Sequence, residues 1–281
     1  MAAEVAGGIF SGSLALLGDA GHMLVDALAL GLSLVAMMLA RRPATATKTF
    51  GYFRLEILAA LANGIILVVV SLVIFYEAYQ RLLEPLAVRT PVMLLVAAIG
   101  LFANIAGIFL LNKASLVSLN VKAAFWHILG DTVSSVGVII AGLIILFTGW
   151  YVADAIAAFV IGGIIIWGAV RIVGESTDIL LEAVPKHIET DKVIEVIKNV
   201  GGVNEVHDMH IWTISSNIYA LSAHLVIDDQ MVSKAIDIVN AARGKLARDF
   251  NITHTTLQLE CQSCPTGLVC DIQRHYTWEN D

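Results

Sequence analysis

Two pairs of side chains in this sequence have the types and spacing of metal ligands. His22 and Asp26 occur in AGHMLVDALALGL, and His127 and Asp131 occur in AFWHILGDTVSSVG. In both segments the histidine and the aspartate are four residues apart, so on a helix they lie on one face, one turn apart. Two imidazoles and two carboxylates are four ligands of the kinds that a tetrahedral zinc site uses. The repeated spacing therefore predicts a zinc site between two helices.

Both pairs lie in apolar segments that are long enough to span a membrane. Of the 281 residues, 58% are hydrophobic and 15% are charged, whereas soluble domains average roughly half apolar and about a quarter charged residues. A spanning helix needs about 20 apolar residues. The shorter apolar segment at 2–17 begins without a preceding loop, so we interpret it as a truncated first helix of a six-helix bundle. The longer segments are 17–40, 57–80, 91–112, 121–148 and 152–173.

An ion pair within each helix is the plain alternative to a metal site. A charged side chain in the middle of a spanning helix costs about 2.5–3.5 kcal/mol, so each histidine and aspartate needs a partner. One histidine and aspartate pair would fit an ion pair and a metal site equally well. Two matching pairs favour a metal site, because a dication offsets the charge of both carboxylates. A position within a membrane bundle favours a transported ion over a structural one. Small residues that would let the two helices approach closely are Gly21, Gly130, Ser134, Ser135 and Gly137.

The residues after the last apolar segment have a different composition. Through Val173 the chain has nine Lys and Arg and eight Asp and Glu, whereas from Gly174 onward it has eight and sixteen. Lys and Arg gather in alternate short loops, a bias that marks the cytoplasmic side and assigns the acidic C-terminal part to it. The sequence has no polybasic run, so nothing in it supports nucleic-acid binding. We expect an integral, multi-pass membrane protein, in a plasma (inner) membrane rather than an organelle.

The C-terminal part follows the order helix, strand, strand, helix, strand. The segments in that order are TDKVIEVIKNV, EVHDMHIWTI, YALSAHLVI, SKAIDIVNAARGKLARDF and THTTLQLE. This order predicts a small α+β domain of the ferredoxin or metallochaperone type with one three-stranded sheet. We predict a transmembrane domain at 1–175, a linker at 176–186, the α+β domain at 187–262 and a tail at 263–281.

Four sequence segments resemble the cation diffusion facilitator family, whose members exchange zinc for protons. They are SGSLALLGDAGHMLVDALAL, FGYFRLEILAALANG, the second HxLxD motif and LLEAVP, and the resemblance extends over residues 3–260. It implies that the transport site consists of His22, Asp26, His127 and Asp131, a set that goes with zinc, and that the protein is a homodimer. Many relatives carry histidines near the second segment for a peripheral metal site, and TATKTFGYFRLE has none.

The resemblance also implies metal ligands in the cytoplasmic domain, at His207, His224 and Glu260. Strand alternation puts His224 and Glu260 on the polar faces of their strands. His207 shares its face with Met209 and Ile211, so alternation does not settle its direction. An ordinary surface side chain is the alternative for each of the three.

Cys261 and Cys264 have the spacing of zinc ligands, but one CxxC motif supplies half of a structural site. A metal-free pair of thiols is the alternative. With Cys270, all three cysteines lie within ten residues, which is unlike the spread of a disulfide framework and indicates a reducing compartment.

Three further polar groups lie in or beside the apolar segments. The resemblance implies an ion pair between Arg54, at the start of the third helix, and Glu182 of LLEAVP, and an exposed Arg54 is the alternative. Asp154 is a helix-packing or a cavity group, and the sequence does not choose between them.

The combined features predict export of Zn²⁺ from the cytoplasm by alternating access, driven by protons. Bound zinc requires neutral imidazole and ionised carboxylate, so protonation of the ligands expels the ion. Zinc is then the transported substrate and a possible regulatory ligand, and the other partners are protons and the lipid bilayer. An enzyme is not expected, because neither HxLxD motif has the glutamate of HExxH. The alternatives are a membrane metalloenzyme that uses the same ligands and a zinc sensor that binds without transport.

Overall fold

The structure is a computed structural model of the chain that describes residues 2–40, 42–115 and 119–262. Within these ranges it does not describe the side chains of residues 33, 37, 111–115 and 119–127. The chain divides into two compact units. The first unit consists of Met1–Ala36 and Ala59–Gly174, and the second unit consists of Met37–Leu58 and Glu175–Asp281.

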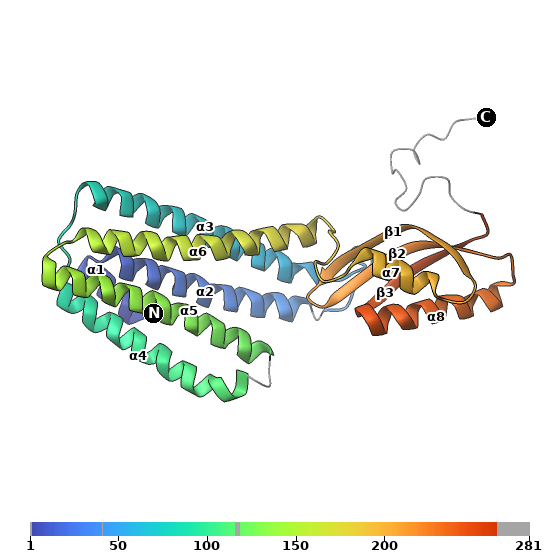
Figure 1. Cartoon of the computed structure of the whole chain (residues 1–281), viewed down its shortest axis with the longest axis horizontal. Coiled ribbons are helices and arrows are strands. Elements are labelled where there is room, and N and C mark those ends of the chain that lie inside the picture. The colour runs from blue at the N-terminus through green and yellow to red at the C-terminus, as the bar shows by residue number, and fades with distance from the viewer. Residues whose placement is uncertain (1, 41, 116–118, 263–281) are drawn as a thin grey trace. The chain divides into compact units, whose positions relative to one another are not determined.

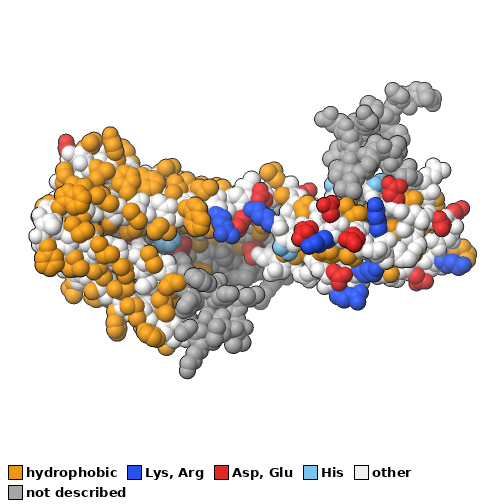
Figure 2. All heavy atoms as spheres, viewed as in Figure 1, with side chains coloured by type: hydrophobic (Ala, Val, Ile, Leu, Met, Phe, Trp, Pro, Cys, Tyr) orange, Lys and Arg blue, Asp and Glu red, His pale blue; other side chains and the backbone are white. Residues whose placement is uncertain are grey.

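Long apolar helices make up the first unit (Figure 1). Among the described residues, five helical segments are long and apolar enough to cross a membrane, which confirms the five predicted spans. Many large apolar side chains on them are exposed, for example Leu30, Phe102 and Phe147, and Figure 2 shows the hydrophobic surface that results. Helices that are apolar on every side need lipid around them. The helices are α1 Ala2–Ser11, α2 Leu14–Ala40, α3 Arg54–Leu83, α4 Thr90–Ser115, α5 Leu119–Thr148 and α6 Val152–Leu180.

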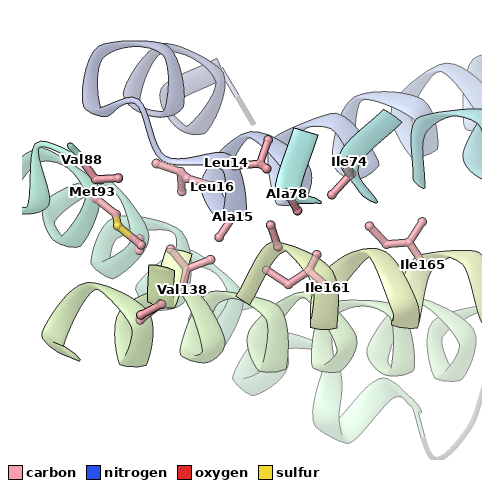
Figure 3. Close-up of a cluster of buried hydrophobic side chains, with 14 of the residues drawn as sticks. Leu14, Ala15, Leu16, Ile74, Ala78, Val88, Met93, Val138, Ile161 and Ile165 are labelled. Carbon is pink, nitrogen blue, oxygen red and sulfur yellow. The ribbon is translucent and has the colours of Figure 1, made fainter. Parts of the chain in front are cut away.

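Small side chains let the helices of the first unit pack closely. Ala15 of α2, Ala78 of α3 and Ala158 of α6 are completely buried, at 0% exposure. They belong to one cluster with larger side chains such as Leu16 and Val138. Figure 3 shows side chains of this cluster projecting from several helices into one shared space. Because lipid is as apolar as the bundle interior, this close packing holds the helices together more than the hydrophobic effect does.

The segment predicted as one truncated helix at 2–17 is divided in the structure, so that boundary was wrong. Helix α1 ends at Ser11, and α2 begins at Leu14. Between them Gly12 has a φ of 73°, a conformation that glycine adopts at little cost. Ser13 then accepts a hydrogen bond from the Leu16 amide at 3.2 Å, which is the pattern of a helix N-cap. Hydropathy does not detect this break, because the residues on both sides of it are apolar.

The C-terminal part of the second unit has the predicted helix, strand, strand, helix, strand order. Its elements are α7 Thr190–Lys198, β1 Val203–Ser215, β2 Ile218–Ile227, α8 Val232–Phe250 and β3 Ile252–Glu260. The strands form one sheet in the order β1-β2-β3, in which β1 and β2 are antiparallel and β2 and β3 are parallel. A parallel neighbour requires a crossover connection, and α8 provides it. Buried side chains of the strands and helices, such as Leu225 and Leu246, form the core.

The first turn of α3 also belongs to the second unit and is bonded within it. Nη2 of Arg54 lies 2.7 Å from Oε1 of Glu182, so the predicted ion pair forms. Two residues further along α3, the carboxylate of Glu56 accepts hydrogen bonds from the hydroxyls of Ser215 and Ser216, both at 2.8 Å. The end of β1 and the turn that follows it are therefore held by the start of α3.

Candidate metal sites

Three of the four predicted membrane ligands meet between α2 and α5. Nε2 of His22 lies 3.2 Å from Oδ2 of Asp26 on the same helix. The same nitrogen lies 3.9 Å from Oδ1 of Asp131 on α5. Around tetrahedral zinc, with ligand bonds of about 2.0–2.1 Å, neighbouring ligand atoms are about 3.4 Å apart. The His22 nitrogen therefore lies at about this distance from one oxygen of each aspartate.

The fourth predicted ligand, His127, lies on α5 one turn before Asp131, but its side chain lies outside the described residues. The helical spacing brings its backbone to the same face of α5 as Asp131. Its role as the fourth ligand stays a prediction.

His22, Asp26 and Asp131, three of the predicted ligands, line a cavity of about 290 Å³ in the first unit. Ser134 of α5 and Leu67 of α3 line it too, and isoleucines and small residues of α6 form the remaining wall. The side chains of His22 and Asp26 are partly exposed in this cavity, at 22% and 19%, whereas that of Asp131 is 8% exposed. The cavity combines ligand atoms with apolar walls, where charges interact more strongly than in water.

A buried acid that the sequence analysis missed lies one turn from these ligands. Asp19 of α2 is 2% exposed, and it accepts a hydrogen bond from Oγ of Ser134 at 2.5 Å. Asp19 precedes His22 by three residues, and Ser134 follows Asp131 by three. Because residues three apart share a helix face, this spacing was the signal that could have identified the pair.

Asp154 has a role that the sequence did not decide, at the N-terminus of α2. Its carboxylate, 1% exposed, accepts hydrogen bonds from the Ser13 hydroxyl and the Leu14 amide at 2.5 and 2.6 Å. Arg81 of α3 lies 3.4 Å from the same carboxylate and donates to the carbonyl of Gly12. The first amides of a helix have no partner within it, and they carry partial positive charge. Asp154 therefore caps the helix that carries His22 and Asp26, and in this way positions it.

In the second unit, His207, His224 and Glu260 come together from three strands. Nε2 of His207 lies 3.0 Å from Oε2 of Glu260, and Nδ1 of His224 lies 2.9 Å from Oε1 of the same carboxylate. One ligand atom from each residue can be chosen so that all lie within 4.8 Å of one another. His207 is 1% exposed, and the other two side chains are about a quarter exposed, at 26% and 24%. The three residues form a partly exposed cluster of nitrogen and oxygen donors.

A bulge in β1 explains why strand alternation did not settle the direction of His207. In the sheet His207 pairs with His224, and His210 pairs with Ser222, so β1 advances three residues where β2 advances two. Asp208 within the bulge has a φ of 45°. The extra residue reverses the alternation, because successive strand residues point to opposite faces. His207 therefore lies on the face of His224, although later residues of β1 on its apparent face are buried in the core.

The thiol candidates at the end of β3 are only partly described. Cys261 directly follows Glu260 and is exposed with a free thiol. Cys264 lies outside the described residues, so the CxxC motif as a metal site stays a prediction.

Matches to protein families cover both units. Residues 1–181 match the cation efflux transmembrane domain, and residues 185–262 match the cytoplasmic domain of cation efflux proteins. The protein therefore belongs to the cation efflux family, which confirms the resemblance to the cation diffusion facilitators. It is an integral membrane protein with a cytoplasmic C-terminal domain, and a transporter rather than an enzyme. The matches give no support to a membrane metalloenzyme or a zinc sensor.

Several characterised relatives are similar over nearly the whole chain. The chain is 39% identical over 266 residues to the cadmium, cobalt and zinc/H(+)-K(+) antiporter of Bacillus subtilis, which is 94% of this chain and 85% of that protein. It is 39% identical over 277 residues to the metal cation efflux system protein CzcD of Cupriavidus metallidurans, which is 98% of this chain and 85% of that protein. The solved metal-bound C-terminal domain of the CzcD transporter from that bacterium is 33% identical, covers 26% of this chain and 99% of that chain, and has a TM-score of 0.24.

Proposed function

We propose that this protein exports zinc from the cytoplasm in exchange for protons. The observation that carries the proposal is the meeting of His22, Asp26 and Asp131 at a cavity inside an apolar bundle. Ionisable groups at that depth are costly unless they have partners, and a divalent cation balances the two carboxylates. His127, one turn from Asp131, supplies the fourth donor.

Proton coupling follows from the chemistry of the ligands. Zinc binds the neutral imidazole and the ionised carboxylate, so a proton on either group competes with the ion. When the cavity opens to a more acidic exterior, protons replace zinc, and when it opens to the cytoplasm, zinc replaces the protons. The name of the Bacillus subtilis relative joins zinc and protons in one antiporter, which supports the same exchange for this chain in a plasma membrane.

The cytoplasmic cluster of His207, His224 and Glu260 is a second, regulatory zinc site in this proposal, and the protein acts as a homodimer. Three protein donors leave a fourth coordination position for water or for a thiol such as that of Cys261. Zinc at this cluster would link all three strands of the sheet. Its occupancy therefore reports the cytoplasmic zinc concentration to the domain.

Zinc uptake into sealed proteoliposomes tests the proposal. The purified chain is reconstituted, and a zinc-sensitive dye reports the lumen while the luminal pH is set below or equal to the outer pH. We expect zinc uptake to accelerate with an acidic lumen, because protons leaving the lumen exchange for zinc. Magnesium should not replace zinc, because nitrogen ligands prefer zinc. Zinc uptake that ignores the pH difference, or uptake equal to that of empty vesicles, would contradict the proposal.

A further inference from the structure

The first unit buries two acids that do not belong to the predicted ligand set. Asp19 on α2 and Glu4 on α1 are 2% and 4% exposed. Ionisable groups inside spanning helices are costly, and they commonly mark ion paths or proton relays. The predicted four-ligand site therefore does not explain why these two acids are buried in the membrane unit.

Asp19 is joined to the transport cavity by one hydroxyl. Ser134 donates a hydrogen bond to Asp19 at 2.5 Å, and Ser134 also lines the cavity that contains His22 and Asp131. A serine hydroxyl donates one hydrogen bond and accepts others, so it can pass a proton from one neighbour to another. The hydroxyl of Ser134 thus stands between a buried acid and the ligand cavity.

Carboxylates of two other helices are close enough to Asp19 to act on its charge. Glu4 of α1 and Asp131 of α5 both act on Asp19 electrostatically, and His22 is one turn away on α2. On the side of α3 and α6, Arg81 and Asp154 are bonded to the N-terminus of α2 instead. Among its described side chains, Thr90–Leu110, α4 has no charged group.

Gly100 of α4 leaves the space that the carboxylate of Glu4 occupies. A Cβ atom at Gly100 would lie 2.5 Å from Oε1 of Glu4 and 3.9 Å from Oγ of Ser135. The first distance is too short for a real contact, so the carboxylate of Glu4 occupies the space that any larger residue would need. Glycine at this position lets the acid of α1 reach toward α4 and α5.

We propose that Asp19 carries the exchanged proton between Glu4, on the outer approach, and the metal ligands, through Ser134. The inference rests on the proposed zinc and proton exchange. Asp19 lies on the outer side of the ligands, because α2 runs from its capped start at Leu14 toward the cytoplasmic loop.

One proton moves in this step. The O–H bond of protonated Asp19 breaks as its proton binds the oxygen of Ser134, and the original hydroxyl proton of Ser134 passes to His22 or Asp131. The protonated ligand releases zinc, and the hydroxyl turns back to donate to ionised Asp19. Glu4 then supplies the next proton to Asp19.

Simultaneous measurement of zinc and proton flux in proteoliposomes of the full chain tests the relay. Asp19→Asn keeps the size and hydrogen-bond acceptor of the side chain but cannot carry a proton. We expect proton-driven zinc flux to fall by at least about tenfold in Asp19→Asn and in Ser134→Ala, as for loss of a proton-transfer group. Zinc affinity, measured by calorimetry in detergent, should be unchanged, and Asp19→Glu should restore the pH profile. Gly100→Ala, which displaces Glu4, should flatten that profile without touching the cavity.

Ser71→Ala is the matched control, because Ser71 is a buried serine on α3 that bonds the carbonyl of Leu67 within its own helix. It should keep the flux and pH profile of the unmutated protein. An unchanged pH profile in Asp19→Asn, or an equal loss of zinc affinity at every pH, would overturn the relay while leaving the antiporter intact. If Asp19→Asn does not fold, the pH profile of zinc flux and the zinc affinity of Ser134→Ala test the relay instead. No pH-driven flux in the unmutated protein would overturn the exchange itself, and the relay with it.

Discussion

The two candidate metal sites of this protein are built in different ways. In the first unit, His22 and Asp26 are close because one helical turn separates them, and a neighbouring helix completes the group. In the second unit, His207, His224 and Glu260 belong to three different strands, and sheet register together with a bulge brings them together. Ligands of the first site are therefore paired by local structure, and ligands of the second by the tertiary fold.

This difference suits the two proposed roles. The helical site can lose or regain its ion when α2 and α5 shift relative to each other, because the predicted ligands are divided between these two helices. The strand site takes its three predicted ligands from three strands, so zinc bound there would link the strands and stabilise the folded domain. A transported ion needs the first arrangement, and a sensed ion suits the second.

The largest expected effect comes from removing a helical ligand. Asp131→Ala deletes an oxygen donor and leaves a residue that favours helix. Because loss of even an outer partner of a metal ligand costs about 10–100-fold, zinc flux in proteoliposomes should fall at least about 100-fold. His224→Ala, which removes a ligand of the other site, should retain transport. Zinc flux that persists in Asp131→Ala would show that the helical site is not the transport site, which is the role that distinguishes it from the strand site.

The next effect concerns the stability of the second unit, measured on the fragment Gly174–Asp281. Saturating zinc at 100 times the dissociation constant adds about 2.7 kcal/mol to the stability of a folded domain. For a domain of this size that corresponds to a rise in melting temperature of roughly 10 °C or more. We expect this rise with Zn²⁺ and little with Mg²⁺, and we expect it to disappear in His224→Ala. The control is His254→Ala, which replaces an exposed histidine on β3. Equal shifts in melting temperature from both metals would show that the cations only relieve charge repulsion in the domain and do not bind a specific site.

The bulge provides a third test, because it lies beside a ligand of the strand site and the helical site has no equivalent. Deleting Asp208 should leave His207 two residues before His210, so regular alternation keeps both on the face of His224, and the zinc-dependent rise in melting temperature should persist. Asp208→Gly should keep that rise, because glycine adopts the left-handed conformation without strain. Circular dichroism would verify that the sheet persists in both variants. Loss of the zinc response in the deletion variant, with the sheet intact, would show that the face of His207 alone does not set the ligand geometry.

The smallest effect is a change of preference at the helical site. His22→Asp replaces a nitrogen donor by a harder oxygen donor at the same helical position. We expect the ratio of zinc to manganese transport to fall by about tenfold, because carboxylates suit manganese better than imidazole does. His210→Asp, at a histidine outside both predicted ligand sets, is the control. An unchanged ratio would show that His22 does not determine selectivity.

Helical features of this chain could be predicted from the sequence because their signals are local. The spans follow from runs of apolar residues, and the ligand pair of His22 and Asp26 follows from a spacing of four. Asp19 carried the same kind of signal, three residues before His22, but it had no second motif to draw attention to it.

Features that depend on packing could not be predicted in this way. The direction of His207 depends on an extra residue in one strand, and aspartate in a left-handed conformation leaves at most a weak mark on the sequence. Asp154 caps a helix that begins 140 residues earlier in the chain, a relation that no local pattern encodes. The convergence of three strands on Glu260 requires the parallel pairing of β2 and β3, which follows from the crossover through α8.

The cap on α2 also sets an order of events during synthesis. The carboxylate of Asp154 and the hydroxyl of Ser13 are 141 residues apart in the chain. At about 5–20 residues per second, the cap arrives on the order of ten seconds after the helix that it completes. Until then Ser13 can accept a hydrogen bond from one amide of α2, but the Leu14 amide and Arg81 lack the carboxylate of Asp154. In a nascent chain stalled before α6, the N-terminus of α2, the helix with His22 and Asp26, would therefore lie in the membrane without the cap from Asp154.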